Sequence, residues 1–260
     1  MKQQKPSLTI IKIGGKIVEN EEALNNVLQQ FAQIGGRKIL IHGGGKAASA
    51  WSQKIGITPQ MIDGRRVTDE ATLEVVTMVY AGLYNKKIVS KLQAIPCNAL
   101  GLTGADLNTI QSHMREVKEI DYGLVGDVDY VHTSILEQLL DNQVVPVFCA
   151  ITHDKKGQLL NTNADTIASE LASALAKIYE VTLKYCFEKK GVLSDPEDDD
   201  AVFPTISFSE FEKYKSEGVI SDGMIPKIDN AFFALKNNVK EVFICGCNTI
   251  EKADGTLIQL

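Results

Sequence analysis

The sequence reads Leu8-Thr-Ile-Ile-Lys-Ile-Gly-Gly15 near its start and Lys38-Ile-Leu-Ile-His-Gly-Gly-Gly45 a little later, two apolar runs that each end in glycines. Segments with the apolar spacing of helices follow them, over Glu22–Ile34 and roughly Lys46–Ile55. This strand–helix–strand–helix order predicts an α/β protein with an open, mainly parallel sheet between helices. Ligands of such sheets bind beyond the carboxyl ends of the strands, where both glycine clusters fall.

The two glycine clusters predict a site for anions. Glycine lets the backbone approach a ligand closely, and the first N–H groups of a helix lack partners within the helix. Lys12 lies within the first apolar run, where a lysine is costly unless it faces a partner. A lysine beside such loops suits the neutralisation of phosphate charge, so the leading hypothesis is phosphoryl transfer. The chain has no Walker A motif.

The rest of the chain keeps the α/β order. An Asp63-Gly64 pair predicts a hairpin over Ile57–Val67, and a long helix is expected over Asp69–Leu92, opened by Thr68. Further strands are expected at Ala99–Leu102, Val144–Cys149, Val181–Phe187 and Glu241–Cys245, and helices at Ser134–Leu140, Ala164–Tyr179 and Met224–Lys236. A boundary near Tyr179 would divide the chain into an N-terminal lobe, residues 1–179, and a C-terminal lobe, residues 180–260.

Composition narrows the class of protein. The chain has 260 residues, 44% of them hydrophobic, which is ordinary for a globular protein with a substantial core. Its formal net charge of −6 argues against a nucleic-acid partner. No apolar run approaches the roughly 20 residues that a membrane span needs, so we expect a cytoplasmic protein without membrane contact. The five cysteines are scattered, and we expect buried free thiols and no metal site.

Three polar clusters are candidates for substrate contacts. Arg65-Arg66 follows the predicted turn and either clamps a carboxylate or is solvated; the sequence favours neither reading. In Asn161-Thr-Asn-Ala-Asp165, Asn163 is a candidate N-cap, which leaves Asn161 for substrate and Asp165 for lysines. Lys227 falls in the first turn of a predicted helix, where a cation is unfavourable unless a phosphate lies nearby. We assign no chemistry to His42.

These motifs, in this order, resemble the amino acid kinase family, most closely its N-acetylglutamate kinases. The resemblance covers nearly the whole chain and rests on the two glycine loops and on further motifs: Gly64-Arg-Arg-Val-Thr68, Leu124-Val-Gly-Asp127, Asn161-Thr-Asn-Ala-Asp165, Gly191-Val-Leu193, Ser221-Asp-Gly-Met224 with Lys227, and Gly255-Thr256. It implies an N-terminal lobe that binds an acylated glutamate and a C-terminal lobe that binds ATP. The implied reaction, in arginine biosynthesis, makes an acyl phosphate on the side-chain carboxylate.

By this resemblance, Lys12 and Lys227 would flank the transferring phosphoryl group, and Asp165 would orient both lysines. The substrate carboxylate is itself the nucleophile, so positioning and electrostatics would carry the catalysis. Mg²⁺ would enter with ATP, held largely by phosphates and water.

The resemblance also implies the binding residues. Gly44 and Gly45 would contact the substrate and phosphate through their N–H groups, and Arg66 and Asn161 would bind the main-chain groups of the glutamate. Contacts to the nucleotide would come from Gly14, Gly15, Glu188, Gly191, Leu193 and Ser221.

One segment departs from the family pattern. A Ser/Thr-Asp pair usually precedes the Gly-Val-Leu motif, whereas this chain has Tyr185-Cys-Phe-Glu-Lys-Lys190. Glu188 would replace the aspartate, with a carboxylate displaced by about an ångström, which would alter contacts to the ribose. The first strand starts within ten residues of Met1, which leaves no room for the extra N-terminal helix of arginine-inhibited hexameric relatives. We therefore expect a homodimer without arginine feedback.

Two alternatives stay open. The acyl group is acetyl by the family norm, but a succinyl group would need only a wider or more basic pocket, and Arg65 could supply that charge. A protein of another class, a ligand-binding regulator that kept the fold and lost turnover, would fit the altered segment around Glu188. It would not need the charges of Lys12, Asp165 and Lys227 together.

Overall fold

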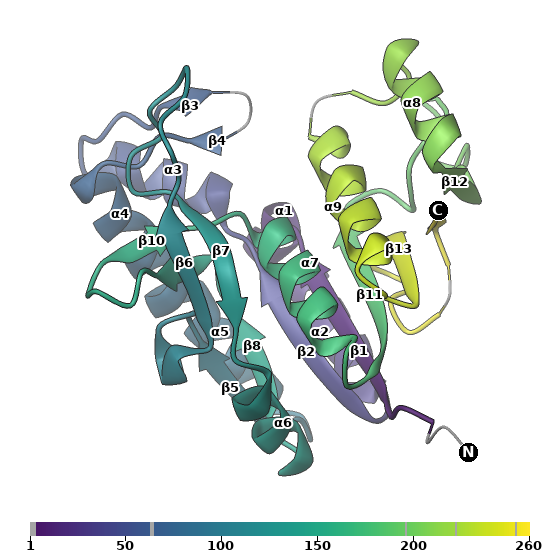
Figure 1. Cartoon of the computed structure of the whole chain (residues 1–260), viewed down its shortest axis with the longest axis horizontal. Coiled ribbons are helices and arrows are strands. Elements are labelled where there is room, and N and C mark those ends of the chain that lie inside the picture. Colours follow the sequence, from purple (N-terminus) through teal and green to yellow (C-terminus); the bar gives the residue numbers. More distant parts are fainter. Residues whose placement is uncertain (1–3, 63–64, 196, 222, 253) are drawn as a thin grey trace.

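The computed structural model describes residues 4–62, 65–195, 197–221, 223–252 and 254–260. Its centre is an eight-stranded sheet with the order β12-β14-β13-β11-β1-β2-β8-β5, in which the neighbours are parallel except β13 and β14 (Figure 1). Its strands are β1 (Ser7–Ile13), β2 (Arg37–His42), β5 (Ala99–Leu102), β8 (Val145–Phe148), β11 (Glu180–Phe187), β12 (Thr205–Ser207), β13 (Glu241–Gly246) and β14 (Thr256–Gln259).

Helices cover both faces of this sheet, as predicted. The helices are α1 (Gly15–Glu19), α2 (Glu21–Gln33), α3 (Gly45–Lys54), α4 (Glu70–Thr77), the π-helix η1 (Met78–Tyr84), α5 (Asn85–Gln93), the 3₁₀ turn η2 (Asp106–Asn108), α6 (Thr133–Asp141), α7 (Ala164–Leu175), α8 (Phe208–Ser216) and α9 (Met224–Lys236). One apolar core includes residues of α4, α6, α7 and α9, and a second core includes residues of α1, α2 and α5.

The central strand β1 separates the two cores. It pairs along its length with β2 on one side and β11 on the other. Successive side chains of a strand face opposite ways, so Leu8 and Ile10 enter the core under α7, while Ile11 and Ile13 enter the core under α2. Lys12 therefore shares the α7 face of the sheet.

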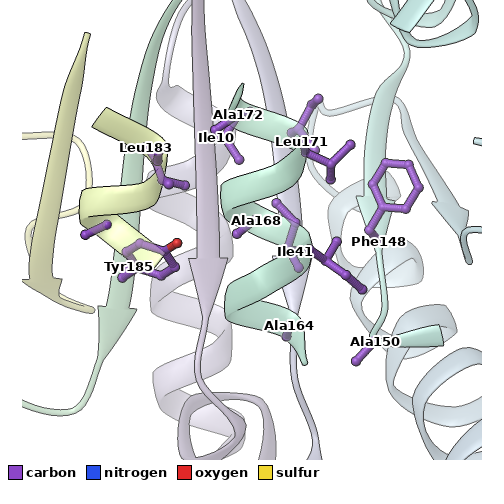
Figure 2. Close-up of a cluster of buried hydrophobic side chains, with 14 of the residues drawn as sticks. Ile10, Ile41, Phe148, Ala150, Ala164, Ala168, Leu171, Ala172, Leu183 and Tyr185 are labelled. Atoms are coloured by element: carbon purple, nitrogen blue, oxygen red, sulfur yellow. The ribbon is translucent and has the colours of Figure 1, made fainter. Parts of the chain in front are cut away.

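Helix α7 lies across the middle of the sheet. Ala164, Ala168, Leu171 and Ala172 turn toward apolar side chains of β1, β2, β8 and β11 (Figure 2). Small alanines let the helix approach the sheet closely. The N-terminus of α7 is thereby held beside the carboxyl end of β1.

A second sheet was not predicted. It has the order β10-β9-β6-β7 and consists of β6 (Ile110–Met114), β7 (Gly126–Val131), β9 (Ile151–His153) and β10 (Leu159–Asn161). A two-stranded hairpin, β3 (Met61–Ile62) and β4 (Arg65–Arg66), is also present, as expected. The Asp63-Gly64 pair of its predicted turn lies outside the described residues.

The structure corrects two predicted helix ends. Asp69, and not Thr68, caps the long helix, because the Asp69 carboxylate accepts from the N–H of Thr72 at 2.8 Å. Helix α7 ends at Leu175 rather than at Tyr179. The long helix over 70–93 also contains the π-helix η1, which its apolar spacing did not indicate.

The structure also bears on the cysteines, on membrane-spanning helices and on the boundary between the two predicted lobes. All five cysteines are free, as predicted, and four of them are buried; Cys247 is only half-buried, contrary to the expectation. No helix in the described ranges is long and apolar enough to cross a membrane. The boundary near Tyr179 stays a prediction: β1 and β11, from its two sides, are neighbours in one sheet.

Candidate active site

The two glycine loops meet at the carboxyl ends of β1 and β2. The N–H of Gly14 donates to the Cys186 carbonyl at 3.0 Å, and the N–H of Gly43 donates to the Ile13 carbonyl at 3.2 Å. A Cβ on Gly15 would lie 3.6 Å from the backbone nitrogens of both Gly44 and Gly45. In the described part of the chain, no group accepts a hydrogen bond from the N–H of Gly44. The loops thus bring backbone donors together, the arrangement expected for an anion site.

Asp165 joins two lysines from different parts of the chain. Its carboxylate lies 2.8 Å from Lys12 Nζ and 3.3 Å from Lys227 Nζ. Lys12 comes from β1, Asp165 from the first turn of α7, and Lys227 from the first turn of α9. The cap of α7 is Asn163, as predicted: its side chain accepts from the N–H groups of Asp165 and Thr166.

The charges of this cluster are partly withdrawn from water. Burial alone would raise the pKa of Asp165, but the two ammonium groups outweigh it and lower that pKa to about 2. Burial, and then repulsion from Lys12, lowers the pKa of Lys227. Two cations and one carboxylate leave excess positive charge beside the glycine loops. An anionic group placed there would be stabilised.

A cavity of about 230 Å³ opens beside this cluster. Its lining includes Lys12, Asp165, Gly15 and the glycines at 43–45. Arg66 and Asn161 line it too, together with the predicted catalytic residues Lys12 and Asp165. Lys227 does not line the cavity and reaches the cluster through its ion pair with Asp165.

Arg66 is buried and only partly paired. Its Nη2 donates to the Gly45 carbonyl at 2.7 Å and to Ser49 Oγ at 2.8 Å. Its Nη1 is buried and has no hydrogen-bond partner among the residues that the structure describes. A buried donor without a partner is costly, so this nitrogen suits a ligand carboxylate. Asn161 is anchored nearby, donating to Thr68 Oγ1 at 3.0 Å.

Arg115 is a cavity residue that sequence reasoning missed. It follows β6 and pairs with Asp127 of β7, with Nε 3.0 Å from Oδ2. Its Nη1, like that of Arg66, is buried and finds no partner in the described part of the chain. Arg115 and Arg65 also line a neighbouring cavity of about 400 Å³. The signal that could have found Arg115 is Asp127, an acidic residue in a quoted motif that needs a cationic partner.

Most of the predicted nucleotide residues do not line that cavity, although Gly15 does. Glu188, Gly191, Leu193 and Ser221 do not line it. Glu188 forms an ion pair with Lys16 of α1; burial would raise the pKa of Glu188, but Lys16 leaves it lowered. Glu188, Gly191 and Leu193 follow β11, and Ser221 precedes α9.

Gly191 has a packing reason to be glycine. A Cβ there would lie 2.5 Å from Cγ1 of Val202 and 2.8 Å from Oγ1 of Thr256. The hydroxyl of Thr256 accepts from the N–H of Val192 at 2.9 Å, and Leu193 forms a bridge with Val202. The Gly-Val-Leu motif therefore packs on the Gly255-Thr256 segment, and the hydrogen bond between them joins residues 64 positions apart in the sequence.

The family model described as the amino acid kinase family matches residues 7–246. The chain belongs to the amino acid kinase family. Among curated members, it is 54% identical to the acetylglutamate kinase of Bacteroides fragilis, over 99% of this chain and 98% of that protein. It is 55% identical to the acetylglutamate kinase of Bacteroides thetaiotaomicron, over 97% and 98% of the two chains.

A solved structure shares this amino acid kinase fold. The crystal structure of smu.665 from Streptococcus mutans superposes with a TM-score of 0.82 at 27% identity, and covers 97% of this chain and 98% of that one. The mainly parallel sheet between helices is thus the architecture of known proteins, as predicted.

Proposed function

We propose that this chain transfers the γ-phosphoryl group of ATP to the side-chain carboxylate of N-acetyl-L-glutamate. The observation that carries the proposal is the cluster of Lys12, Asp165 and Lys227 beside a cavity with a half-paired arginine. The names of the relatives, acetylglutamate kinases at 54% and 55% identity, support the same substrate and a place in arginine biosynthesis.

The chemistry needs no covalent intermediate on the enzyme. An oxygen of the substrate carboxylate attacks the γ-phosphorus, the bond from that phosphorus to the β–γ bridging oxygen breaks, and ADP leaves with the electron pair. Negative charge on the phosphoryl oxygens must be stabilised throughout. Lys12 and Lys227 supply the positive charge, and the N–H groups of Gly44 and Gly45 supply donors. Asp165 holds both ammonium groups in place.

The substrate is held on the N-terminal side of the site. The unpartnered Nη1 of Arg66 would donate to the α-carboxylate, and Asn161 would bind the acylamino group. Both residues sit on short strands whose backbones are paired, so their positions are set before the substrate binds.

The nucleotide would bind at the first glycine loop, through Gly14 and Gly15, and at the residues that follow β11 or precede α9, which are Glu188, Gly191, Leu193 and Ser221. The described residues include no group of three or more potential metal ligands, and both oxygens of Asp165 are paired with lysines. Mg²⁺ would therefore be held by the phosphates of ATP and by water, and would neutralise phosphate charge when bound.

We also propose that the protein is a cytoplasmic homodimer and that it does not bind nucleic acid. Strand β5 is an edge of the large sheet, and Leu100 on that strand is exposed. Met78 and Leu83, on the helix that leads to β5, are exposed apolar side chains as well. An unpaired edge strand and exposed apolar residues support pairing with a second copy.

N-succinyl-L-glutamate is a second candidate substrate, favoured by one observation. Arg65 and Arg115 line both this cavity and its neighbour, and no described residue accepts a hydrogen bond from the buried Nη1 of Arg115. A carboxylate at the end of a succinyl group would satisfy that nitrogen, whereas an acetyl methyl group would not.

Hydroxylamine trapping of the acyl phosphate tests these proposals. The full chain is incubated with ATP and Mg²⁺ and with N-acetyl-L-glutamate, N-succinyl-L-glutamate or L-glutamate. Hydroxamate from one acylated substrate identifies the acyl group. Absence of product with all three, while ATP still binds, would contradict the kinase and favour a ligand-binding regulator.

A further inference from the structure

A chain of hydrogen bonds through His42 and Asn85 orients the peptide between Gly43 and Gly44. The Gly43 carbonyl, which can only accept, lies 2.8 Å from Nδ1 of His42. Nδ1 therefore carries the proton and donates. Burial lowers the pKa of His42 to about 4, so the ring is neutral at pH 7 and its Nε2 is an acceptor. Nδ2 of Asn85 lies 3.2 Å from that Nε2 and donates to it.

The orientation of Asn85 is fixed from a second direction. Its Nδ2 also donates to the Val147 carbonyl on β8 at 2.9 Å, so both amide hydrogens are used. Its Oδ1 accepts a hydrogen bond from Lys86 Nζ. Gly101 leaves room for this oxygen, because a Cβ on Gly101 would lie only 2.0 Å from it. Asn85 is fully enclosed, with 1% of its surface exposed. This arrangement assigns one tautomer to His42.

The hydrogen bond to Gly43 decides where the next N–H points. In a trans peptide the carbonyl and the following N–H point in opposite directions. Because the Gly43 carbonyl is turned toward His42, the N–H of Gly44 is turned away from it. That N–H has no acceptor among the described residues, and Gly44 lines the cavity.

The π-helix η1 also carries Tyr80, whose side chain contacts the same glycine loop. The ring of Tyr80 packs on Gly44, where a Cβ would lie 3.0 Å from Cδ1 of Tyr80. Tyr80 and Asn85 are five residues apart, which on an α-helix places side chains about 140° apart. Here the N–H of Asn85 donates to the Tyr80 carbonyl, the bond that defines a π-helix. Residues five apart then lie on one face, so a single helix holds the loop through both side chains.

We propose that His42 and Asn85 are positioning residues that aim the N–H of Gly44 at the transferring phosphoryl group, and that the π-helix exists to bring Asn85 and Tyr80 to this loop. The proposal rests on the kinase function proposed above. Neither His42 nor Asn85 lines the cavity, so both act through the glycine backbone.

Two substitutions of His42 separate positioning from packing. In His42→Asn, the side-chain amide occupies the place of Nδ1 and still donates to Gly43. In His42→Gln, the amide reaches the place of Nε2, so the donor to the Gly43 carbonyl is lost, although glutamine fills more of the histidine volume than asparagine does. We expect kcat of His42→Asn to exceed that of His42→Gln by about 10-fold or more, with little change in the KM for ATP. Complete loss of one donor to the charge of a transition state lowers kcat by about 10²–10³-fold, and a misdirected donor should cost part of that. Equal kcat values, or the reverse order, would overturn the proposal.

Nitrogen-15 NMR of the histidine rings gives a readout that does not depend on turnover. The His42 signal is identified by its absence from His42→Asn. We expect protonated Nδ1 in the natural protein and protonated Nε2 in Asn85→Asp, whose carboxylate accepts where the amide donates. The same variant should lose about 10-fold or more in kcat, whereas Ile88→Val, a buried change on the same helix, should not.

Either of two results would overturn the hydrogen-bond chain: protonated Nε2 in the natural protein, or an unchanged tautomer in Asn85→Asp. A tautomer change with unaltered kcat would overturn the positioning role. A natural protein without kinase activity would contradict the proposed function instead, and the NMR measurement would still decide the hydrogen-bond chain.

Discussion

Lys12 and Asp165 form an ion pair of 2.8 Å that ties the end of the central strand β1 to the first turn of α7. Removing one member of a buried pair destabilises a fold, because the remaining charge loses its compensation. Lys227 joins the pair from α9 at 3.3 Å. The cluster is thus assembled from three elements that are far apart in the sequence.

Lys227→Ala should lower kcat by about 10²-fold or more, because the charge on the transferring group loses one of its two lysines. The KM for N-acetyl-L-glutamate should change little, since Arg66 and Asn161 are untouched. Steady-state kinetics measures both. Lys236→Ala, in the last turn of the same helix, is the control and should retain the natural rate. Equal rates for both variants would contradict the catalytic role of Lys227.

Arg66→Lys should raise the KM for N-acetyl-L-glutamate about 10-fold or more and leave kcat within about 3-fold. Lysine keeps the charge but cannot bind Gly45, Ser49 and a substrate carboxylate together. The matched control is Arg37→Lys, since Arg37 pairs with Asp141 and does not line the cavity. A fall in kcat at unchanged KM would show that Arg66 acts on the reaction rather than on binding.

The free energy of unfolding should fall between pH 6.5 and pH 4 by up to about 3 kcal/mol on account of His42. The pKa of this histidine is lowered to about 4 by burial, so in that range the unfolded chain binds a proton that the folded chain does not. Urea denaturation at several pH values measures the slope. In His42→Asn this contribution should vanish, and an identical pH slope in both proteins would refute it.

Gly255→Ala should destabilise the fold by more than Gly157→Ala, by about 2 kcal/mol or more. The two glycines have nearly equal φ, +104° and +106°, so the left-handed φ disfavours a side chain at both positions. A Cβ on Gly255 would lie 2.4 Å from the Ile244 carbonyl, whereas a Cβ on Gly157 would have no neighbour within 4 Å. Thermal and urea unfolding of the two variants gives the difference, and equal losses would contradict this account.

The sequence predicted the strands of the large sheet that carry the site. Runs such as Leu8–Ile13 lie between two apolar cores, and a mostly apolar character, interrupted here by Thr9 and Lys12, is typical of central parallel strands. The glycine loops and the Asn163 cap are local features, decided by a few neighbouring residues. They could therefore be located without knowledge of the packing.

The sequence did not predict the second sheet, Arg115 or the roles of His42 and Asn85. Strands β9 and β10 have three residues each, too few for a periodic pattern. Asn85 resembles any polar residue in a helix until the π-helix turns it toward His42. Such features depend on contacts between distant segments, which single-sequence periodicity does not contain.

The pairing of β1 with β11 has a consequence for synthesis on the ribosome. Ser7 is paired with Glu180, so the central strand leaves the exit tunnel long before its partner is made. At the usual rate of elongation, the intervening stretch takes roughly 10 to 35 s. During that time one edge of β1 has no native partner, and it is a place where chaperones could bind the nascent chain.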